Sequence, residues 1–141
     1  ISLIALVNGV LAFLGGLFGH PTLSLEFLTG YLFFPIAWIM GVPSHDALTV
    51  GALLGKKLIL NEFVAYQDLQ TYMSTMSPRS VTLATYALCG FSNFGSVAIQ
   101  VGGIGSLAPE RSHDLAKLGI RSLIAGTLAC LMTACIAGIL I

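Results

Sequence analysis

Residues 55–66 read Gly-Lys-Lys-Leu-Ile-Leu-Asn-Glu-Phe-Val-Ala-Tyr, and they place charged side chains inside a largely apolar stretch. A straight membrane-spanning helix here would place two ammonium groups and a carboxylate near the bilayer centre, where each costs roughly 2.5–3.5 kcal/mol to insert. A re-entrant hairpin over 44–73, with its tip near 56–61, instead places them against protein or a water-filled cavity, where non-helical backbone is tolerated. The sequence predicts this hairpin, whose first helix can be capped by Ser44 or Asp46.

The composition of the whole chain is that of an integral membrane protein. Hydrophobic residues make up 56% of the 141 residues, charged residues make up 9%, and the mean hydropathy is +0.93. Soluble domains usually carry about 25% charged residues, so this chain could not cover a globule with a solvated surface. Three segments lack any acidic or basic residue, namely 1–25, 80–109 and 122–141, and each is as long as the roughly 20 residues that a spanning helix needs.

A second interruption lies inside the uncharged segment 80–109. Residues 89–96 read Cys-Gly-Phe-Ser-Asn-Phe-Gly-Ser, so small and polar residues stand at its midpoint. This composition predicts a broken helix over 80–108, and transporter binding sites are typically built from half-helix ends near the membrane midplane.

The remaining segments predict simpler helices. Residues 1–19 read as one spanning helix, and residues 113–141 as the final one. Residues 22–41 are rich in aromatic side chains, which favours a helix lying at the membrane interface over a second full span. The predicted fold is therefore all-α, with transmembrane helices, a re-entrant hairpin and a broken helix.

Glu62 is the first candidate for a functional side chain, because an ionisable group at membrane depth is functional by default. A carboxylate accepts strongly from paired hydroxyls such as those of a ribose. The alternative is a structural role, in which Glu62 forms a salt bridge with Lys56 or Lys57 and stabilises the hairpin.

Asn93 and Ser96 are the next candidates. Their spacing puts them on one face of a helix, and at a helix break both could point into the cavity that Glu62 faces. Helix-to-helix hydrogen bonding is the alternative for both. Phe91 is a candidate apolar wall of the same pocket, or an ordinary packing residue, and Asn61 is predicted to hold the hairpin tip through backbone contacts.

Several other functions are not supported by the sequence. Six basic and six acidic residues cancel, which indicates no nucleic-acid partner. The three histidines are scattered, and the three cysteines lie in apolar stretches, where we expect buried free thiols instead of a disulfide or metal framework. No nucleophile and base stand in a catalytic pattern, so we predict no enzyme, no cofactor and no resident metal.

Two motifs resemble the concentrative nucleoside transporter family. Residues 55–66 are similar to its signature G-x-K-x-x-x-N-E-F-V-A-Y, and residues 87–97 are similar to A-L-C-G-F-A-N-F-x-S-[IV], with Ser92 where Ala is usual. The stretches 102–111 and 134–138 continue the resemblance, which covers essentially the whole chain.

The resemblance implies the C-terminal half of a homotrimeric transporter with two inverted repeats. Residues 1–19 become a scaffold span, 22–41 an interfacial helix, 44–73 the second hairpin, 80–108 the broken helix and 113–141 the final span. It implies a multi-pass protein of the cell (inner) membrane, embedded in lipid, that carries nucleosides by alternating access in symport with sodium or protons.

Site residues are implied by the same resemblance. Glu62, Asn93 and Ser96 would bind the ribose hydroxyls, and Phe91 would line the pocket. The first hairpin and its broken partner, which contact the nucleobase and supply the ion ligands in the family, have no counterpart in these residues.

Two rival functions remain open from the sequence. An ion-coupled transporter of another small polar solute could also place Glu62 at a hairpin tip, and nucleosides would then leave its thermal stability unchanged. A non-transporting membrane receptor would bind nucleosides without accumulating them in vesicles.

Overall fold

The chain folds into helices throughout the part that the structure describes. The structure is a computed structural model, and it describes residues 2–20 and 23–141. The elements in chain order are α1 Ser2–Leu17, α2 Leu25–Ile39, α3 Ser44–Ile59, α4 Glu62–Tyr72, α5 Pro78–Leu88, α6 Phe94–Leu107, the short 3-10 helix η1 Pro109–Arg111 and α7 Ser112–Ile139. The predicted all-α class is confirmed.

Two interruptions divide the middle of the chain. Within 44–73 the helix α3 ends at Ile59 and α4 begins at Glu62, so that only two residues separate them. Within 80–108 the five residues 89–93 separate α5 from α6. The depth at which either interruption lies in a membrane stays a prediction.

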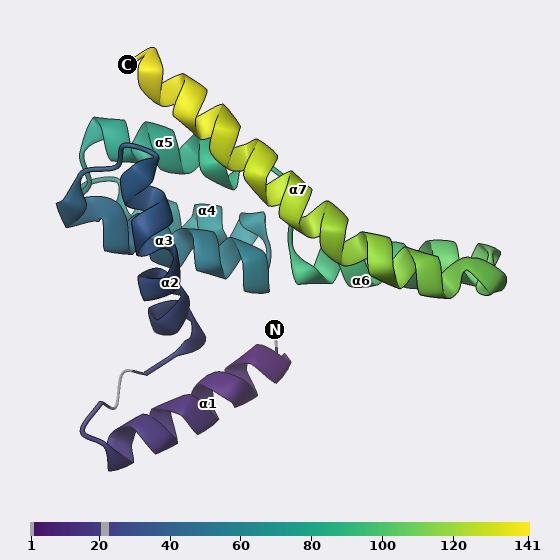
Figure 1. The fold of residues 1–141 in the computed structure, drawn as a ribbon. Coiled ribbons are helices and arrows are strands. Elements are labelled where there is room, and N and C mark those ends of the chain that lie inside the picture. Colours follow the sequence, from purple (N-terminus) through teal and green to yellow (C-terminus); the bar gives the residue numbers. More distant parts are fainter. Residues whose placement is uncertain (1, 21–22) are drawn as a thin grey trace.

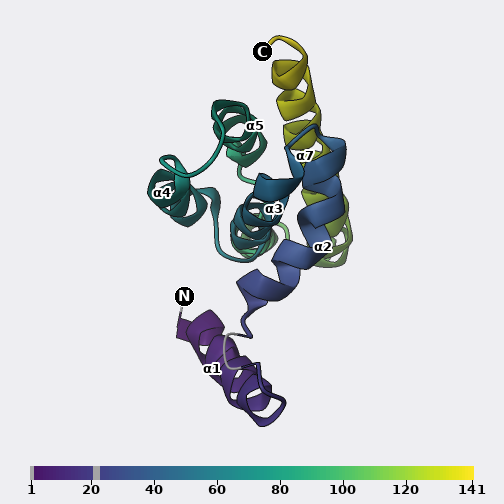
Figure 2. The ribbon, with the colours of Figure 1, turned by 90° about the vertical axis from the view of Figure 1, so that its left-hand side faces the viewer.

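Helix α3 lies at the centre of the fold. Figure 2 shows it between α2 on one side and α4 on the other. Its close approach to α2 depends on small residues: a Cβ atom added to Gly51 would lie 2.6 Å from the carbonyl oxygen of Gly30. The buried core includes Val50 and Leu53 of α3 together with Leu83 and Leu88 of α5, so the core joins the first half of the hairpin to the first half of the broken helix.

Helix α7 runs along both halves of the broken helix (Figure 1). A Cβ atom on Gly138 would lie 2.7 Å from a methyl group of Leu83 in α5, and one on Gly119 would lie 2.7 Å from a methyl group of Val97 in α6. One glycine therefore allows close packing at each end of α7, because a larger side chain there would meet the neighbouring helix.

Helix α1 lies apart from the other helices (Figure 1). Its interior Asn8 joins it to the start of α2, since the amide nitrogen donates to Glu26 at 2.9 Å and the amide oxygen accepts from the backbone N–H of Leu25 at 2.9 Å. A polar contact of this kind fixes the helix pair without a broad packed interface.

Among the described residues, the helical stretch Pro109–Ile139 is long and apolar enough to cross a membrane. Ala5–Leu17, Leu25–Ile39 and Phe94–Leu107 are apolar but shorter, and a single straight span needs about 20 residues. The two halves of the broken helix are each too short alone, so they could cross the bilayer only together.

Two local predictions were wrong. Neither Ser44 nor Asp46 caps α3, because both lie inside the first turn of the helix and Pro43 occupies the capping position. The buried Asp46 carboxylate instead accepts from the backbone N–H of Ser77, before α5, at 3.0 Å. The three cysteines are free thiols as predicted, but only Cys130 is buried, whereas Cys135 is half-buried and Cys89 is exposed.

Candidate functional site

The site is built from the starts of two helices. The first N–H groups of a helix lack partners within it, and an Asn before the helix commonly accepts from one of them. Asn61 does so for α4, where its side-chain oxygen accepts from the N–H of Val64 at 3.0 Å. Asn93 does so for α6, where its side-chain oxygen accepts from the N–H of Ser96 at 2.7 Å. The prediction that Asn61 holds the hairpin tip through backbone contacts is confirmed.

A hydrogen bond joins the two helix starts. The side-chain amide of Asn93 donates to a carboxylate oxygen of Glu62 at 3.1 Å. Glu62 is the first residue of α4, and Asn93 is 2% exposed. Two helix N-termini, each carrying a partial charge of roughly +0.5, therefore lie next to one carboxylate.

Gly95, in the first turn of α6, lies beside the hairpin turn. A Cβ atom at this position would lie 3.3 Å from the Asn93 side-chain oxygen and 3.9 Å from the carbonyl oxygen of Leu60 in the turn. The start of α6 thus lies within van der Waals distance of the hairpin turn, where Glu62 and Asn93 form their hydrogen bond.

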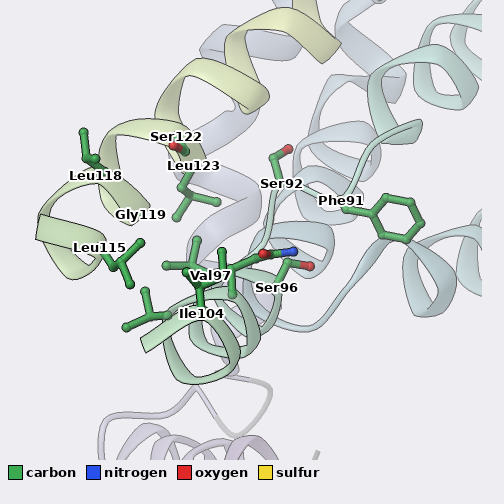
Figure 3. Close-up of a pocket in the computed structure, with 12 residues that line it drawn as sticks. Phe91, Ser92, Ser96, Val97, Ile104, Leu115, Leu118, Gly119, Ser122 and Leu123 are labelled. Carbon is green, nitrogen blue, oxygen red and sulfur yellow. The ribbon is translucent and has the colours of Figure 1, made fainter. Parts of the chain in front are cut away.

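Ser96 and Phe91 flank this bond but do not join it in the described structure. The Ser96 backbone donates to Asn93, and its side chain is half-buried at the edge of a cavity. Phe91 is 78% exposed, and its ring points away from the side chains of α6 and α7 (Figure 3). The predicted Glu62, Asn93 and Ser96 are therefore brought together, whereas Phe91 lies beside them with its ring free to contact another body.

The cavity lies between α6 and α7 and has a volume of about 370 Å³. Apolar side chains such as Val97, Ile104 and Leu118 form most of its wall (Figure 3). Polar groups come from Ser96, Gln100 and Ser122. Pockets for small molecules usually combine an apolar wall with a few polar groups in this way.

The structural alternative for Glu62, an ion pair with one of the two lysines, is not what the structure shows. Lys56 pairs with Asp68 of α4. Lys57 is 3% exposed, and its ammonium donates to the carbonyl oxygen of Ala87 at 3.0 Å. Among the described residues, the only side-chain hydrogen-bond partner of Glu62 is Asn93.

Two further contacts at this site were not predicted. The Tyr66 hydroxyl donates to the carbonyl oxygen of Thr85 at 2.7 Å, and the Cys130 thiol donates to that of Cys89 at 3.4 Å. In both contacts, a side chain from another helix donates to a backbone carbonyl at the C-terminal end of α5. No local pattern in the sequence indicates them, because each joins residues at least 19 positions apart.

Metal binding has no support in this part of the chain. The described residues contain no group of three or more His, Cys, Asp or Glu side chains placed to hold an ion. The carboxylate of Glu62 has the side-chain amide of Asn93 as its hydrogen-bond partner.

The described helices have the fold of solved membrane-transporter structures. The chain superimposes on the structure described as "CNTnw in an inward-facing substrate-bound state" with a TM-score of 0.87 and 44% identity, covering 97% of this chain and 34% of that one.

The chain belongs to the family described as "Na+ dependent nucleoside transporter C-terminus", which it matches over residues 1–138. This is a family of transporters and not of enzymes. One similar relative is the "Uncharacterized transporter YutK" of Bacillus subtilis, 49% identical over all of this chain and 35% of that protein. Another is "Solute carrier family 28 member 3" of Eptatretus stoutii, 47% identical over 99% of this chain and 23% of that protein. The chain thus spans about a third or less of the length of these relatives.

Proposed function

We propose that this chain supplies the ribose-binding part of a nucleoside transporter that works in symport with sodium or protons. The observation that carries the proposal is the Glu62–Asn93 hydrogen bond at the meeting point of two helix starts. The family description supports both a nucleoside cargo and a sodium ion.

Each site residue has a role in this proposal. One carboxylate oxygen of Glu62 accepts from Asn93, which leaves the other oxygen to accept from a ribose hydroxyl. The Ser96 hydroxyl adds a second polar contact, and the exposed Phe91 ring covers the sugar or base from the apolar side. A half-buried carboxylate with amide and hydroxyl neighbours favours hydroxyl donors, because a substrate lacking them leaves polar groups unpaired.

Transport would proceed by alternating access without covalent chemistry. The hairpin and the broken helix would move as one unit relative to a scaffold that includes α1, in a homotrimer embedded in the lipid of the cell membrane. The ligands of the coupling cation are expected outside these residues, and no cofactor is required.

The first test is substitution of Glu62. We expect Glu62→Gln in the native transporter to weaken nucleoside binding by about 30-fold, because a charge-assisted hydrogen bond contributes roughly 2 kcal/mol. Lys57→Gln keeps a donor for Ala87 and should weaken binding far less. Asp68→Asn is a matched control, since it neutralises another hairpin carboxylate away from the site. Normal binding by Glu62→Gln would leave that residue with a structural role only.

The second test uses the substrate. Asn93→Ala and Ser96→Ala should impair a ribonucleoside more than its 2′,3′-dideoxy analogue, because the analogue lacks the hydroxyls that these residues would bind. The measurement is the ratio of the two dissociation constants in each variant. Equal losses for the two substrates would contradict the ribose assignment.

The same preparation separates the rival functions. Nucleosides should raise the melting temperature of the protein, and vesicles with an imposed cation gradient should accumulate labelled uridine. No thermal shift would indicate another small polar solute as the cargo. Binding without accumulation would indicate a receptor.

A further inference from the structure

The end of α5 is completed by other helices. The last carbonyl groups of a helix lack partners within it and need donors from elsewhere. At the end of α5, the N–H of Cys89 reaches the carbonyl of Tyr86 at 3.2 Å. The carbonyls of Thr85, Ala87 and Cys89 accept instead from side chains of α4, α3 and α7 respectively.

Lys57 is the charged member of this group. The residue is 3% exposed, and its ammonium donates to the carbonyl oxygen of Ala87 at 3.0 Å. Among the described residues, no carboxylate lies within ion-pair distance of it. A buried charge without compensation costs several kcal/mol, so something else in the fold must stabilise this cation.

Two helix ends can supply that compensation. Lys57 lies in the last turn of α3, and its acceptor Ala87 lies in the last turn of α5. The C-terminus of a helix carries a partial charge of roughly −0.5, so two of them offset about one positive charge. The two interruptions thus place the Lys57 ammonium at the ends of α3 and α5. They place the Glu62 carboxylate at the starts of α4 and α6.

The backbone of the second interruption passes directly beside the ammonium. A Cβ atom on Gly90 would lie 4.0 Å from the Lys57 nitrogen and 2.5 Å from the Cys130 sulfur. Only residues 88–92 lie between Ala87, which Lys57 binds, and Asn93, which binds Glu62. A displacement of the backbone at Ala87 would therefore also displace Asn93, because the connecting segment is short.

We propose that Lys57 is a positioning residue for the sugar site. Its ammonium holds the end of α5 and thereby sets the place where Asn93 meets Glu62. This inference rests on the proposed function, because its effect is read through nucleoside binding.

The test compares the two adjacent lysines in the native transporter. Lys57→Met keeps the length of the side chain but removes the charge and the donor. We expect it to raise the dissociation constant for uridine about tenfold, the effect of about 1.4 kcal/mol, and that for 2′,3′-dideoxyuridine less than twofold. Lys56→Met is the matched control, since Lys56 pairs with Asp68 on another side of the hairpin, and should change neither constant.

A second variant separates positioning from folding. Lys57→Gln keeps an amide donor for Ala87 and should restore most of the uridine affinity, even if Lys57→Met is poorly folded. Normal uridine binding by Lys57→Met, an equal loss of both nucleosides, or a Lys57→Gln variant that folds but binds uridine no better than Lys57→Met would overturn the proposal. A wild-type protein that binds no nucleoside would instead refute the proposed function.

Discussion

The two interruptions of the helical chain are alike where the following helix starts, and they differ where the preceding helix ends. The helix after each interruption is capped by a preceding Asn, whose side chain accepts from the backbone N–H three residues later. The helix before the first interruption ends on its own backbone, with the N–H of Leu60 bound to the carbonyl of Lys56 at 2.8 Å. The helix before the second ends on side chains from three other helices.

This difference shows which interruption depends on the rest of the fold. The hairpin turn needs two residues and local bonds, so its geometry follows from its own sequence. The end of α5, from which the interruption 89–93 starts, is held by Lys57, Tyr66 and Cys130, which belong to distant parts of the chain. Binding residues at such a place can be adjusted by contacts that never touch the substrate.

The largest loss of stability is expected where the backbone of α3 packs against the backbone of α2. A Cβ atom on Gly51 would lie 2.6 Å from the Gly30 oxygen and 3.0 Å from the Phe34 nitrogen, and neither backbone atom can rotate away. Gly51→Ala should lower the free energy of unfolding in detergent micelles by about 3 kcal/mol, the upper end for overpacking. Gly102→Ala, with open space around it, should lower it by nothing measurable. Equal stability of the two variants would contradict the close contact.

A smaller loss is expected at the second interruption, where the obstacle is a side chain. A Cβ atom on Gly90 meets the Cys130 sulfur, so Gly90→Ala should cost about 2 kcal/mol. Adding Cys130→Ala removes the obstacle, and the double variant should be less destabilised than the sum of the two single variants. Strict additivity in the unfolding measurements would show that the two residues do not meet.

The two capping asparagines should separate stability from binding. Asn61→Ala and Asn93→Ala each lose one helix cap, which costs about 1 kcal/mol of stability. Only Asn93 also bonds to Glu62. Nucleoside affinity, measured by isothermal titration, should therefore fall for Asn93→Ala and change little for Asn61→Ala. A comparable fall in both would place the hairpin cap in the site as well.

The smallest effect is expected for Tyr66→Phe. The variant loses one hydroxyl bond to Thr85 in a solvent-exposed position, so its unfolding free energy should fall by about 0.5 kcal/mol. Tyr72→Phe is the control, because the Tyr72 hydroxyl makes no hydrogen bond among the described residues. An unchanged melting temperature for Tyr66→Phe would show that the Tyr66 hydroxyl does not help to stabilise the end of α5.

Local features of this fold could be predicted from the sequence, and long-range ones could not. Asn61 was assigned its backbone role correctly because Asn is a common helix cap and acts within three residues. Ser44 and Asp46 were assigned wrongly, since both residue types suit a cap but the helix already begins at Ser44, after Pro43. The partner of Asp46 is a backbone N–H 31 positions away, which no local pattern indicates.

The site shows the same division. Polar residues in apolar stretches marked Glu62 and Asn93 as unusual, but their direct bond spans 31 positions and required the folded chain. Lys57 was considered only as a partner of Glu62, because sequence reasoning pairs opposite charges. Its carbonyl acceptor belongs to a helix end, and helix ends become neighbours only through tertiary packing.

The ion pair between Lys56 and Asp68 has a consequence for the membrane voltage. Residues 44–108 hold three acidic and three basic side chains, so this unit has no net charge with its histidine neutral: Asp46, Lys56, Lys57, Glu62, Asp68 and Arg79. Moving one elementary charge through 100 mV changes the energy by about 2.3 kcal/mol. In the proposed cycle residues 44–108 would therefore add no net charge to the moving unit, and the voltage would do no electrical work on this part of it.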